Sequence, residues 1–194
     1  MKTFAKIIRI LTVSPIMALM LCLVLYFDKN INFASLSMFF VCIACLCVLP
    51  VVAYPVEKCT HIFAKISGQN SQRQCERKLA ICFSILGYII LTIVCFATNQ
   101  SSVLKQMSLT YLFSGILIFV FSVIIKINAS GHVCGVVGPI VFLTHFVSLY
   151  FLFLLLLLVP VCWGSLKLAR HSKLELLCGG IIPVVSFLIA ITLI

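Results

Sequence analysis

Long apolar runs, interrupted only by short polar stretches, constrain the fold of this chain more than any other feature. Apolar segments lie near 7–27, 32–54, 79–97 and 107–126, and each is long enough to cross a hydrocarbon layer about 30 Å thick. The 194 residues are 63% hydrophobic and only 9% charged, so a soluble domain would lack the residues for its polar surface. The sequence therefore predicts an all-α, polytopic integral membrane bundle of about six or seven transmembrane helices.

Two short polar islands, each carrying a histidine, interrupt the apolar C-terminal half. The first island is Lys126–His132 and the second island is Lys167–Glu175. Polar groups at membrane depth are costly, and those that occur commonly serve a function. The longest polar stretch, 57–78, divides the chain into two N-terminal transmembrane helices (1–56), a basic polar loop and a C-terminal transmembrane core (79–194).

The segment 133–170 determines whether the two islands lie on the same face of the membrane. As one helix it would be about 57 Å long, well beyond the thickness of a membrane. A hairpin that turns near Thr144–Ser148 gives two short passes and brings both islands to one face. A single tilted span over about 137–160 would leave them on opposite faces. Length favours the hairpin, which is followed by a last span over about 174–193.

The charge of the chain is strongly positive, with a formal net charge of +10. If the hairpin forms, all the cations except Lys29 and Lys105 share one face, which the positive-inside rule makes the cytoplasmic face of an inner or plasma membrane. These cations lie between apolar spans, so we expect the bilayer and no nucleic acid as partner. They can set topology, contact anionic lipid or bind an anionic substrate, and these roles are compatible.

The second island contains the residue types that a phosphoryl-transfer site needs. Glu175 follows His171 by four residues, so on a helix the two lie on one face, and the carboxylate can fix the imidazole tautomer for nucleophilic attack. Lys167 and Arg170 can bind phosphoryl oxygens and stabilise the charge that develops there. The alternative is an interfacial cluster whose long side chains reach the lipid headgroups.

The first island supplies complementary groups. Ser130 and Gly131 directly before a helix offer backbone N–H groups and the positive end of the helix dipole to an anion. His132 at the helix start can protonate a leaving oxygen as a general acid, and Lys126 can add positive charge. Together the two islands predict a phosphate site with a histidine nucleophile.

These residues resemble motifs of the type 2 phosphatidic acid phosphatase superfamily, integral-membrane lipid phosphatases related to vanadium haloperoxidases. The family's second motif, Pro-Ser-Gly-His, is similar to Ala129-Ser-Gly-His132. Its third motif, Ser-Arg-x5-His-x3-Asp, is similar to Gly164-Ser165-x5-His171-x3-Glu175. The flanking Gly135-Val-Val-Gly138-Pro139 and Gly179 also resemble short divergent members, and the resemblance covers about 70–180.

The resemblance implies a phosphatase/haloperoxidase-like core over 79–194 and a role for each matching residue. His171 would be the nucleophile that forms a phosphohistidine, Glu175 its orienting acid and His132 the general acid. Ser130 and Gly131 would be phosphate ligands, and no metal or organic cofactor would be needed.

The chain departs from the family pattern at three places. Ser165 occupies the arginine position of the third motif, so Lys167 or Arg170 would have to supply that charge. Glutamate replaces aspartate at position 175. The first motif, Lys-x6-Arg-Pro, is absent as such, although Arg73 and Arg77 lie at about the right distance before the second motif and are expected to contribute to phosphate binding.

The function that we predict is hydrolysis of a lipid phosphomonoester or polyprenyl diphosphate through a phosphohistidine. The alternative is a catalytically silent protein of the same fold that binds anionic headgroups or acts as a membrane interaction partner. A small transporter would carry paired broken helices in two similar halves, and the sequence contains no such repeat.

Overall fold

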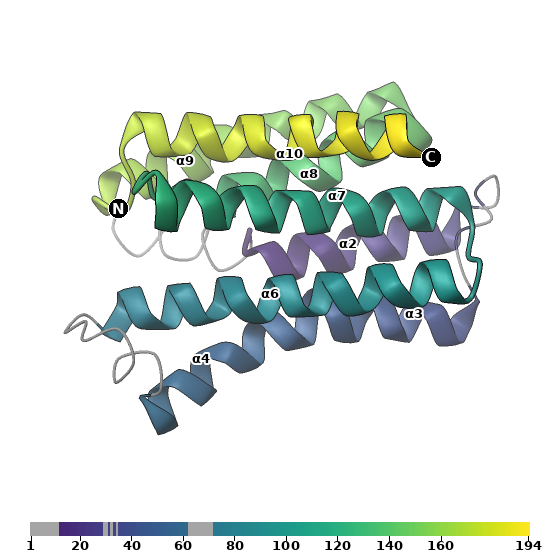
Figure 1. Ribbon diagram of the computed structural model, residues 1–194. Helices are drawn as coiled ribbons and strands as arrows, with labels where there is room; N and C mark the ends of the chain where they lie inside the picture. The colour runs from purple at the N-terminus through teal and green to yellow at the C-terminus, as the bar shows by residue number, and fades with distance from the viewer. Residues whose placement is uncertain (1–11, 29–30, 32, 34, 62–71) are drawn as a thin grey trace.

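The computed structural model describes residues 12–28, 31, 33, 35–61 and 72–194, without the side chains of Gln72 and Arg73 (Figure 1). All regular structure in these ranges is helical. The elements in chain order are α2 (Ser14–Phe27), α3 (Leu36–Ile43), the π-helical η1 (Ala44–Val48), α4 (Leu49–Thr60), α6 (Gln72–Ala97), α7 (Ser102–Phe119), the π-helical η2 (Val120–Ile124), α8 (Gly131–Phe146), the 3-10 helix η3 (Leu149–Leu157), α9 (Leu158–Lys167) and α10 (Lys173–Leu193).

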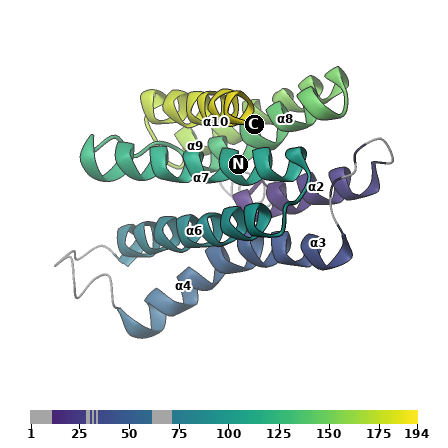
Figure 2. The ribbon, with the colours of Figure 1, turned by 45° about the vertical axis from the view of Figure 1, so that its right-hand side comes forward.

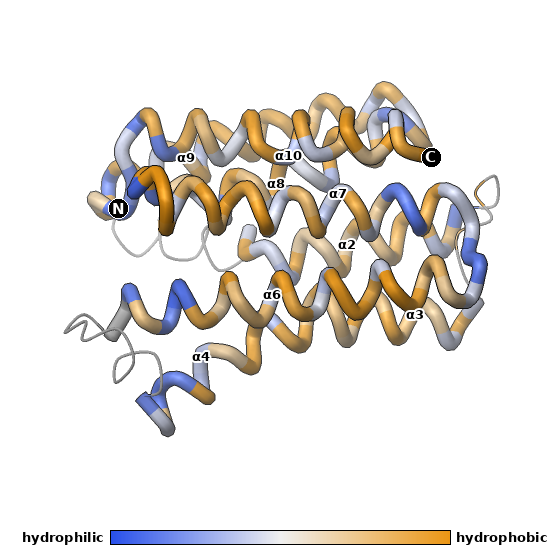
Figure 3. The backbone as a smooth tube through the Cα atoms, in the orientation of Figure 1, coloured by the Kyte–Doolittle hydropathy of each residue, from blue (hydrophilic) through white to orange (hydrophobic). Residues whose placement is uncertain are grey.

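The helices have the lengths and composition of membrane spans. Five segments of the described chain are long and apolar enough to cross a bilayer: Leu36–Thr60, Gln74–Ala97, Ser102–Ile124, Leu149–Lys167 and Lys173–Leu193. The apolar helices α2 and α8 are shorter. Figure 3 shows hydrophilic segments gathered at the two ends of the helices, with apolar chain between them. This distribution suggests a membrane protein whose two ends lie at the two interfaces.

Several helices continue beyond the apolar runs that predicted them. α4 extends to Thr60 and α6 begins at Gln72, so the polar loop expected over 57–78 is shorter than predicted. The first turns of α6 are rich in Gln, Glu, Arg and Lys, which are good helix formers and tolerate the interface. Residues 1–11, which include the start of the expected first span, lie outside the described residues.

The segment 133–170 contains a helix break. α8 ends at Phe146, and Ser148 begins η3, where its side chain accepts a hydrogen bond from the Tyr150 backbone N–H (3.4 Å). The N–H groups of Val147 and Ser148 both bond to the Leu143 carbonyl, which closes the end of α8. α8 then packs against η3 and α9, so the chain folds back as the hairpin alternative predicts.

The helix made of α3, η1 and α4 is bent. Its centre is the π segment η1, followed by Pro50 and Pro55, and both features disrupt the regular helical ladder. Figures 1 and 2 both show α4 turning away from the axis that the other helices share. Next to the bend, a Cβ on Gly87 would overlap the Cys45 carbonyl, so glycine allows α6 to approach η1 closely.

The core lies around α2, which packs against α8 on one side and against α3 and η1 on another. Leu21, Cys22 and Leu25 of α2 are fully buried there, together with Leu91 of α6 and Phe142 of α8. The short α2 therefore has apolar neighbours rather than lipid along its buried face, which explains how a 14-residue helix is held in the bundle.

Candidate active site

The two polar islands meet at one end of the bundle. The backbone N–H of Ser130, in the first island, donates a hydrogen bond to the backbone carbonyl of Glu175, in the second (2.9 Å). Gly179 of α10 packs against the backbone of Ser130. A Cβ built on Gly179 would lie 2.5 Å from the Ser130 carbonyl oxygen. Only a glycine at position 179 lets α10 approach the start of α8 this closely.

The start of α8 is held by three side chains from different parts of the sequence. Ser130 caps the helix, with its hydroxyl accepting from the Val133 N–H (3.5 Å). The Arg77 guanidinium donates to the Ala129 carbonyl (2.8 Å), and the Ser14 hydroxyl donates to the Gly131 carbonyl (2.8 Å). The first-turn N–H groups of a helix are not used within it, so α8 offers backbone donors to an anion at a firmly positioned end.

His171 and Glu175 form the contact that their spacing predicts. The imidazole Nδ1 of His171 lies 3.2 Å from the Glu175 carboxylate, and the histidine side chain is only 7% exposed. In the neutral imidazole, a proton on Nδ1 would be donated to this carboxylate, which leaves the lone pair on Nε2. This is the tautomer that a histidine nucleophile needs.

The Glu175 carboxylate has a second role at the start of α10. It accepts from the Ser172 N–H (2.9 Å), while the Ser172 hydroxyl accepts from the Glu175 N–H (3.3 Å). The two bonds form a capping box. The carboxylate is thus fixed by the helix that follows it, and its charge lies near the positive end of that helix.

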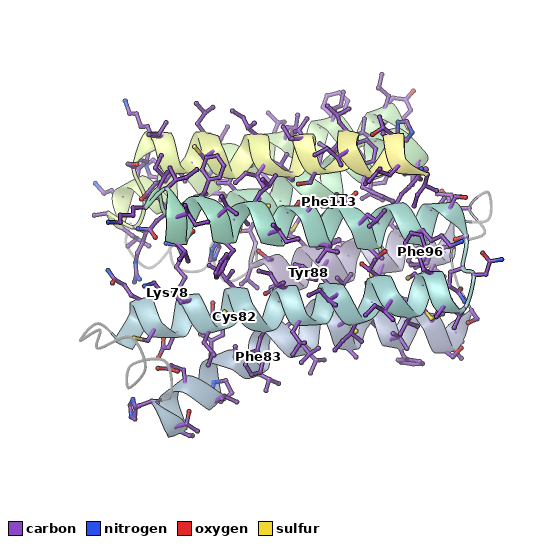
Figure 4. The ribbon with its side chains drawn as sticks, viewed as in Figure 1. Lys78, Cys82, Phe83, Tyr88, Phe96 and Phe113 are labelled. Atoms are coloured by element: carbon purple, nitrogen blue, oxygen red, sulfur yellow. The ribbon has the colours of Figure 1, made fainter. Side chains whose placement is uncertain are left out.

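A cavity of about 430 Å³ opens beside these groups and extends into the bundle. Its polar end is lined by His132, His171, Arg170, Arg77 and Glu76. Its inner end includes the aromatic rings of Tyr88 and Tyr111, which lie 5.4 Å apart between centroids. Figure 4 shows Tyr88 partway along α6, with Lys78 towards one end of that helix and Phe96 towards the other. The cavity therefore reaches from the polar end to the middle of the bundle.

The structure brings most of the predicted site residues together. His132, His171, Arg170, Arg77 and Gly131 line the cavity. Glu175 and Ser130 lie directly behind this lining, where the first orients His171 and the second caps α8.

Two predicted phosphate ligands lie away from the cavity lining, and the side chain of a third lies outside the described residues. Lys126 and Lys167 are exposed at the same end of the bundle and are not among the cavity-lining residues. Lys126 has a left-handed backbone (φ 62°) where the chain turns from η2 towards α8. The side chain of Arg73 lies outside the described residues. The described cations at the cavity are therefore Arg77 and Arg170.

Ser165, the residue at the motif-three arginine position, is fully buried in α9. Its hydroxyl has no hydrogen-bond partner within the described structure, and the residue is not part of the cavity lining. Its backbone carbonyl accepts from the Arg170 N–H (2.9 Å). Within this motif, the arginine that lines the cavity is thus Arg170, five residues after Ser165, at the turn that leads to His171.

Sequence reasoning missed Ser14. The residue precedes Pro15 at the start of α2, and Ser-Pro at a helix start is a local signal with no functional content. Its hydrogen bond to Gly131 joins residues that are far apart in sequence. A Cβ on Gly135 would overlap the Ser14 side chain, so α2 and α8 are in close contact at the cavity.

Within the described part of the chain, no three His, Cys, Asp or Glu side chains gather as metal ligands. No protein-family model matches the chain, and neither a curated protein nor a solved structure matches it.

Proposed function

We propose that this chain is a membrane lipid phosphatase that hydrolyses a lipid phosphomonoester or a polyprenyl diphosphate through a phosphohistidine intermediate. The observation that carries the proposal is that His132 and His171 line one cavity while Glu175 contacts the Nδ1 of His171. A nucleophile, its orienting carboxylate and a second histidine at an anion-binding helix start are the groups that this chemistry requires.

In the first step, Nε2 of His171 attacks the phosphorus atom and the bond to the leaving oxygen breaks. His132 gives its proton to that oxygen, which leaves as the lipid alcohol or as a lipid monophosphate. Arg77 and Arg170 bind the phosphoryl oxygens and stabilise the charge that develops there, together with backbone N–H groups at the start of α8. Glu175 stabilises the imidazolium character of His171 through its contact with Nδ1.

In the second step, His132 takes a proton from a water molecule, and the hydroxide attacks the phosphorus atom. The P–N bond breaks, inorganic phosphate leaves, and His171 returns to its neutral form with the proton on Nδ1. The proton that His132 loses in the first step is recovered in the second, so neither an oxidant nor a co-substrate other than water is needed.

The membrane arrangement that goes with this function is a seven-span bundle with a phosphatidic acid phosphatase-like core. The seven passes would be α2, α3 to α4, α6, α7, α8, η3 to α9, and α10. The cation-rich end that carries the site would face the cytoplasm. The hairpin of α8 and α9 supports this proposal, because it returns the second island to the end of the first.

The test is phosphate release by purified protein in mixed micelles that contain phosphatidate, phosphatidylglycerol phosphate, a polyprenyl diphosphate or the single-chain dodecyl phosphate. Wild type is compared with His171→Ala and with His145→Ala. His145 is exposed at the far end of α8 and is not part of the cavity lining, so it is a matched control. Release that is lost in His171→Ala and kept in His145→Ala supports the proposal. No release from any lipid contradicts it.

The rival candidate is a protein that binds phosphate headgroups without turnover. One observation favours it, namely that the capping box alone explains a glutamate at position 175. Trapping distinguishes the two. A phosphatase forms an acid-labile, alkali-stable phosphoprotein from ³²P-labelled substrate, and His171→Ala does not. A binding protein retains labelled lipid but forms no covalent adduct.

A further inference from the structure

We infer that the cavity binds a phosphate that carries one unbranched or prenyl chain of limited length. The depth of the cavity along α8 sets this limit at about 12 carbons. The inference rests on the proposed function for the phosphate end, and it names the class of substrate as a single-chain lipid phosphate. Diacyl lipids such as phosphatidate are then poor ligands.

The depth of the cavity can be read along α8. Its lining residues Gly131, Gly135, Gly138 and Phe142 recur at helical spacing, so they form one face of the helix. Three of them are glycines, and Ser14 of α2 fills the space beside Gly135, whereas only Pro183 lies within 4 Å of a Cβ built on Gly138. At 1.5 Å per residue, the distance from Gly131 to Phe142 is about 16 Å.

A second helix gives the same depth independently. The lining residues of α6 run from Arg77, beside the phosphate end, to Tyr88. These residues are also 11 positions apart, which again corresponds to about 16 Å along the helix axis. Tyr88 contacts the ring of Tyr111 from α7, so aromatic side chains narrow the cavity at this depth.

The inner end of the cavity is closed by core residues. Leu21, Leu46 and Phe142 all line it and all belong to the buried core around α2. A chain of 1.5 Å carbon–carbon bonds at tetrahedral angles advances about 1.3 Å per carbon, so about 12 carbons fill 16 Å. A longer chain has to bend back, because the core beyond Phe142 is packed.

Common diacyl lipids exceed the depth of the cavity. At about 1.3 Å per carbon, an extended tail of about 18 carbons is roughly 23 Å long, beyond the roughly 16 Å from Gly131 to Phe142.

The cavity has a side from which an apolar chain can enter. Val51 and Tyr54 of α4 line it and are about half exposed, at 50% and 47%. They lie just beyond the bend at η1 and Pro50, where α4 turns away from the other helices (Figure 2). Val13 and Ser14 at the start of α2 line the cavity as well. Within the described part of the chain, we place the entry of the lipid chain between α2 and α4.

Chain selection in such a site comes from space rather than from hydrophobic attraction. A tail that moves from lipid into an apolar cavity exchanges one apolar environment for another, so added carbons gain little while they fit. Affinity should therefore be nearly constant up to the length of the cavity and fall beyond it.

The experiment measures the binding of alkylphosphonates with 8, 12 and 20 carbons to purified protein in micelles. Ligand concentrations are expressed as mole fractions in the micelle. The C–P bond is not hydrolysed, so binding is measured without turnover. We expect the C8 and C12 ligands to bind within about threefold of each other, and the C20 ligand and dioleoyl phosphatidate at least tenfold more weakly. Equal binding of the C12 and C20 ligands, equal binding of phosphatidate, or no binding at all overturns the inference.

Gly138 provides a variant that shortens the cavity. A Cβ there meets only Pro183, at an ordinary 3.5 Å, and position 138 is about 10 Å along α8 from Gly131, the length of roughly eight carbons. Gly138→Val should weaken the C12 ligand at least tenfold and the C8 ligand less than threefold. Gly180→Val is the matched control, because its Cβ meets only Val133 at 3.7 Å and the residue is not part of the cavity lining.

The two proposals fail separately. If the C12 phosphonate binds with the expected length limit but no lipid phosphate is hydrolysed, the phosphatase proposal is wrong and the single-chain site stands. If lipid phosphate is hydrolysed but Gly138→Val weakens all chain lengths equally, the length limit is wrong and the phosphatase stands. Melting temperatures of both valine variants show whether they are folded.

Discussion

Ser130 and Glu175 are joined through their backbones, with the N–H of Ser130 donating to the carbonyl oxygen of Glu175 over 2.9 Å. Ser130 caps the helix that carries His132, and Glu175 lies in the first turn of the helix that follows His171. The two histidine-bearing segments are therefore fixed to each other without any of the side chains that we propose to be catalytic. Substitutions of the site side chains should change activity while this junction, and the fold around it, remain.

Glu175→Gln should separate catalysis from stability. A glutamine keeps the capping box with Ser172, but it is neutral and no longer stabilises the imidazolium form of His171. We expect kcat to fall about 100-fold or more, with a smaller change in KM and a melting temperature near that of wild type. Steady-state kinetics on one lipid phosphate, together with thermal unfolding in detergent, provide the measurement.

Ser172→Ala is the opposite control. It removes the helix cap and should cost about 1 kcal/mol of stability, yet the contact between His171 and Glu175 remains and kcat should change little. A loss of kcat in Ser172→Ala as large as that in Glu175→Gln would mean that the carboxylate acts only through the helix cap.

Arg77→Gln should weaken both the loop before α8 and phosphate binding. The guanidinium bonds to the Ala129 carbonyl and also lines the cavity, and hydrogen bonds from charged groups contribute about 1.5–3 kcal/mol. We expect kcat/KM to fall about 10- to 100-fold, as measured with the same lipid phosphate.

The neighbouring cation gives the control for net charge. Lys78→Gln removes the same charge one residue further along α6, at a position that is not part of the cavity lining. Its kcat/KM should stay within about threefold of wild type at 0.15 M salt, because a charge outside the cavity lining makes no direct phosphate contact and is screened by salt. Equal losses in the two variants would indicate general electrostatics rather than a phosphate contact by Arg77.

Much of this arrangement follows from local sequence. Apolar length predicts the helices, and the excess length of 133–170 predicts the turn that lies at Val147–Ser148. The i, i+4 spacing of His171 and Glu175 predicts their contact, because both lie on one face at the start of a helix. Ser172 and Glu175 also have capping-box spacing, a signal that places the start of α10 from sequence alone.

The remaining features depend on contacts between distant segments. The hydrogen bond from Ser14 to Gly131 joins α2 to α8, and no local pattern at Ser14 indicates it. The bend at η1 arises within an apolar run, so hydrophobicity does not reveal where α4 leaves the bundle. Lys126 and Lys167 lie close to the histidines in sequence but not in the cavity lining, because the chain turns between each lysine and its histidine.

Gly179→Ala should destabilise the protein. A methyl group there would lie 2.5 Å from the Ser130 carbonyl oxygen and 3.0 Å from its backbone nitrogen, and neither backbone atom can move without disturbing the cap of α8. We expect a loss of about 1–3 kcal/mol in the free energy of unfolding, as for other overpacked sites. Denaturant unfolding in mixed micelles measures it.

Gly180→Ala is the adjacent control. Its Cβ meets only Val133 at 3.7 Å, so it should be neutral or stabilise α10 by up to about 1 kcal/mol through helix propensity. If Gly179→Ala were as stable as Gly180→Ala, the close approach of α10 to Ser130 would be wrong.

Gly131→Ala tests the phosphate end of the cavity without disturbing the fold. A Cβ at this position has no neighbouring atom within 4 Å, and the residue begins α8, so stability should change by less than about 0.5 kcal/mol. The methyl group would instead stand in the cavity beside His132, where the phosphoryl group is proposed to bind. Since a displacement of about 1 Å can cost 100-fold in rate, we expect kcat/KM to fall at least tenfold.

The control is Gly180→Ala, which adds the same methyl group outside the cavity, and steady-state kinetics of the two variants are compared. Unchanged kinetics in Gly131→Ala would mean that the phosphate does not bind at the start of α8 and that His132 is not the general acid.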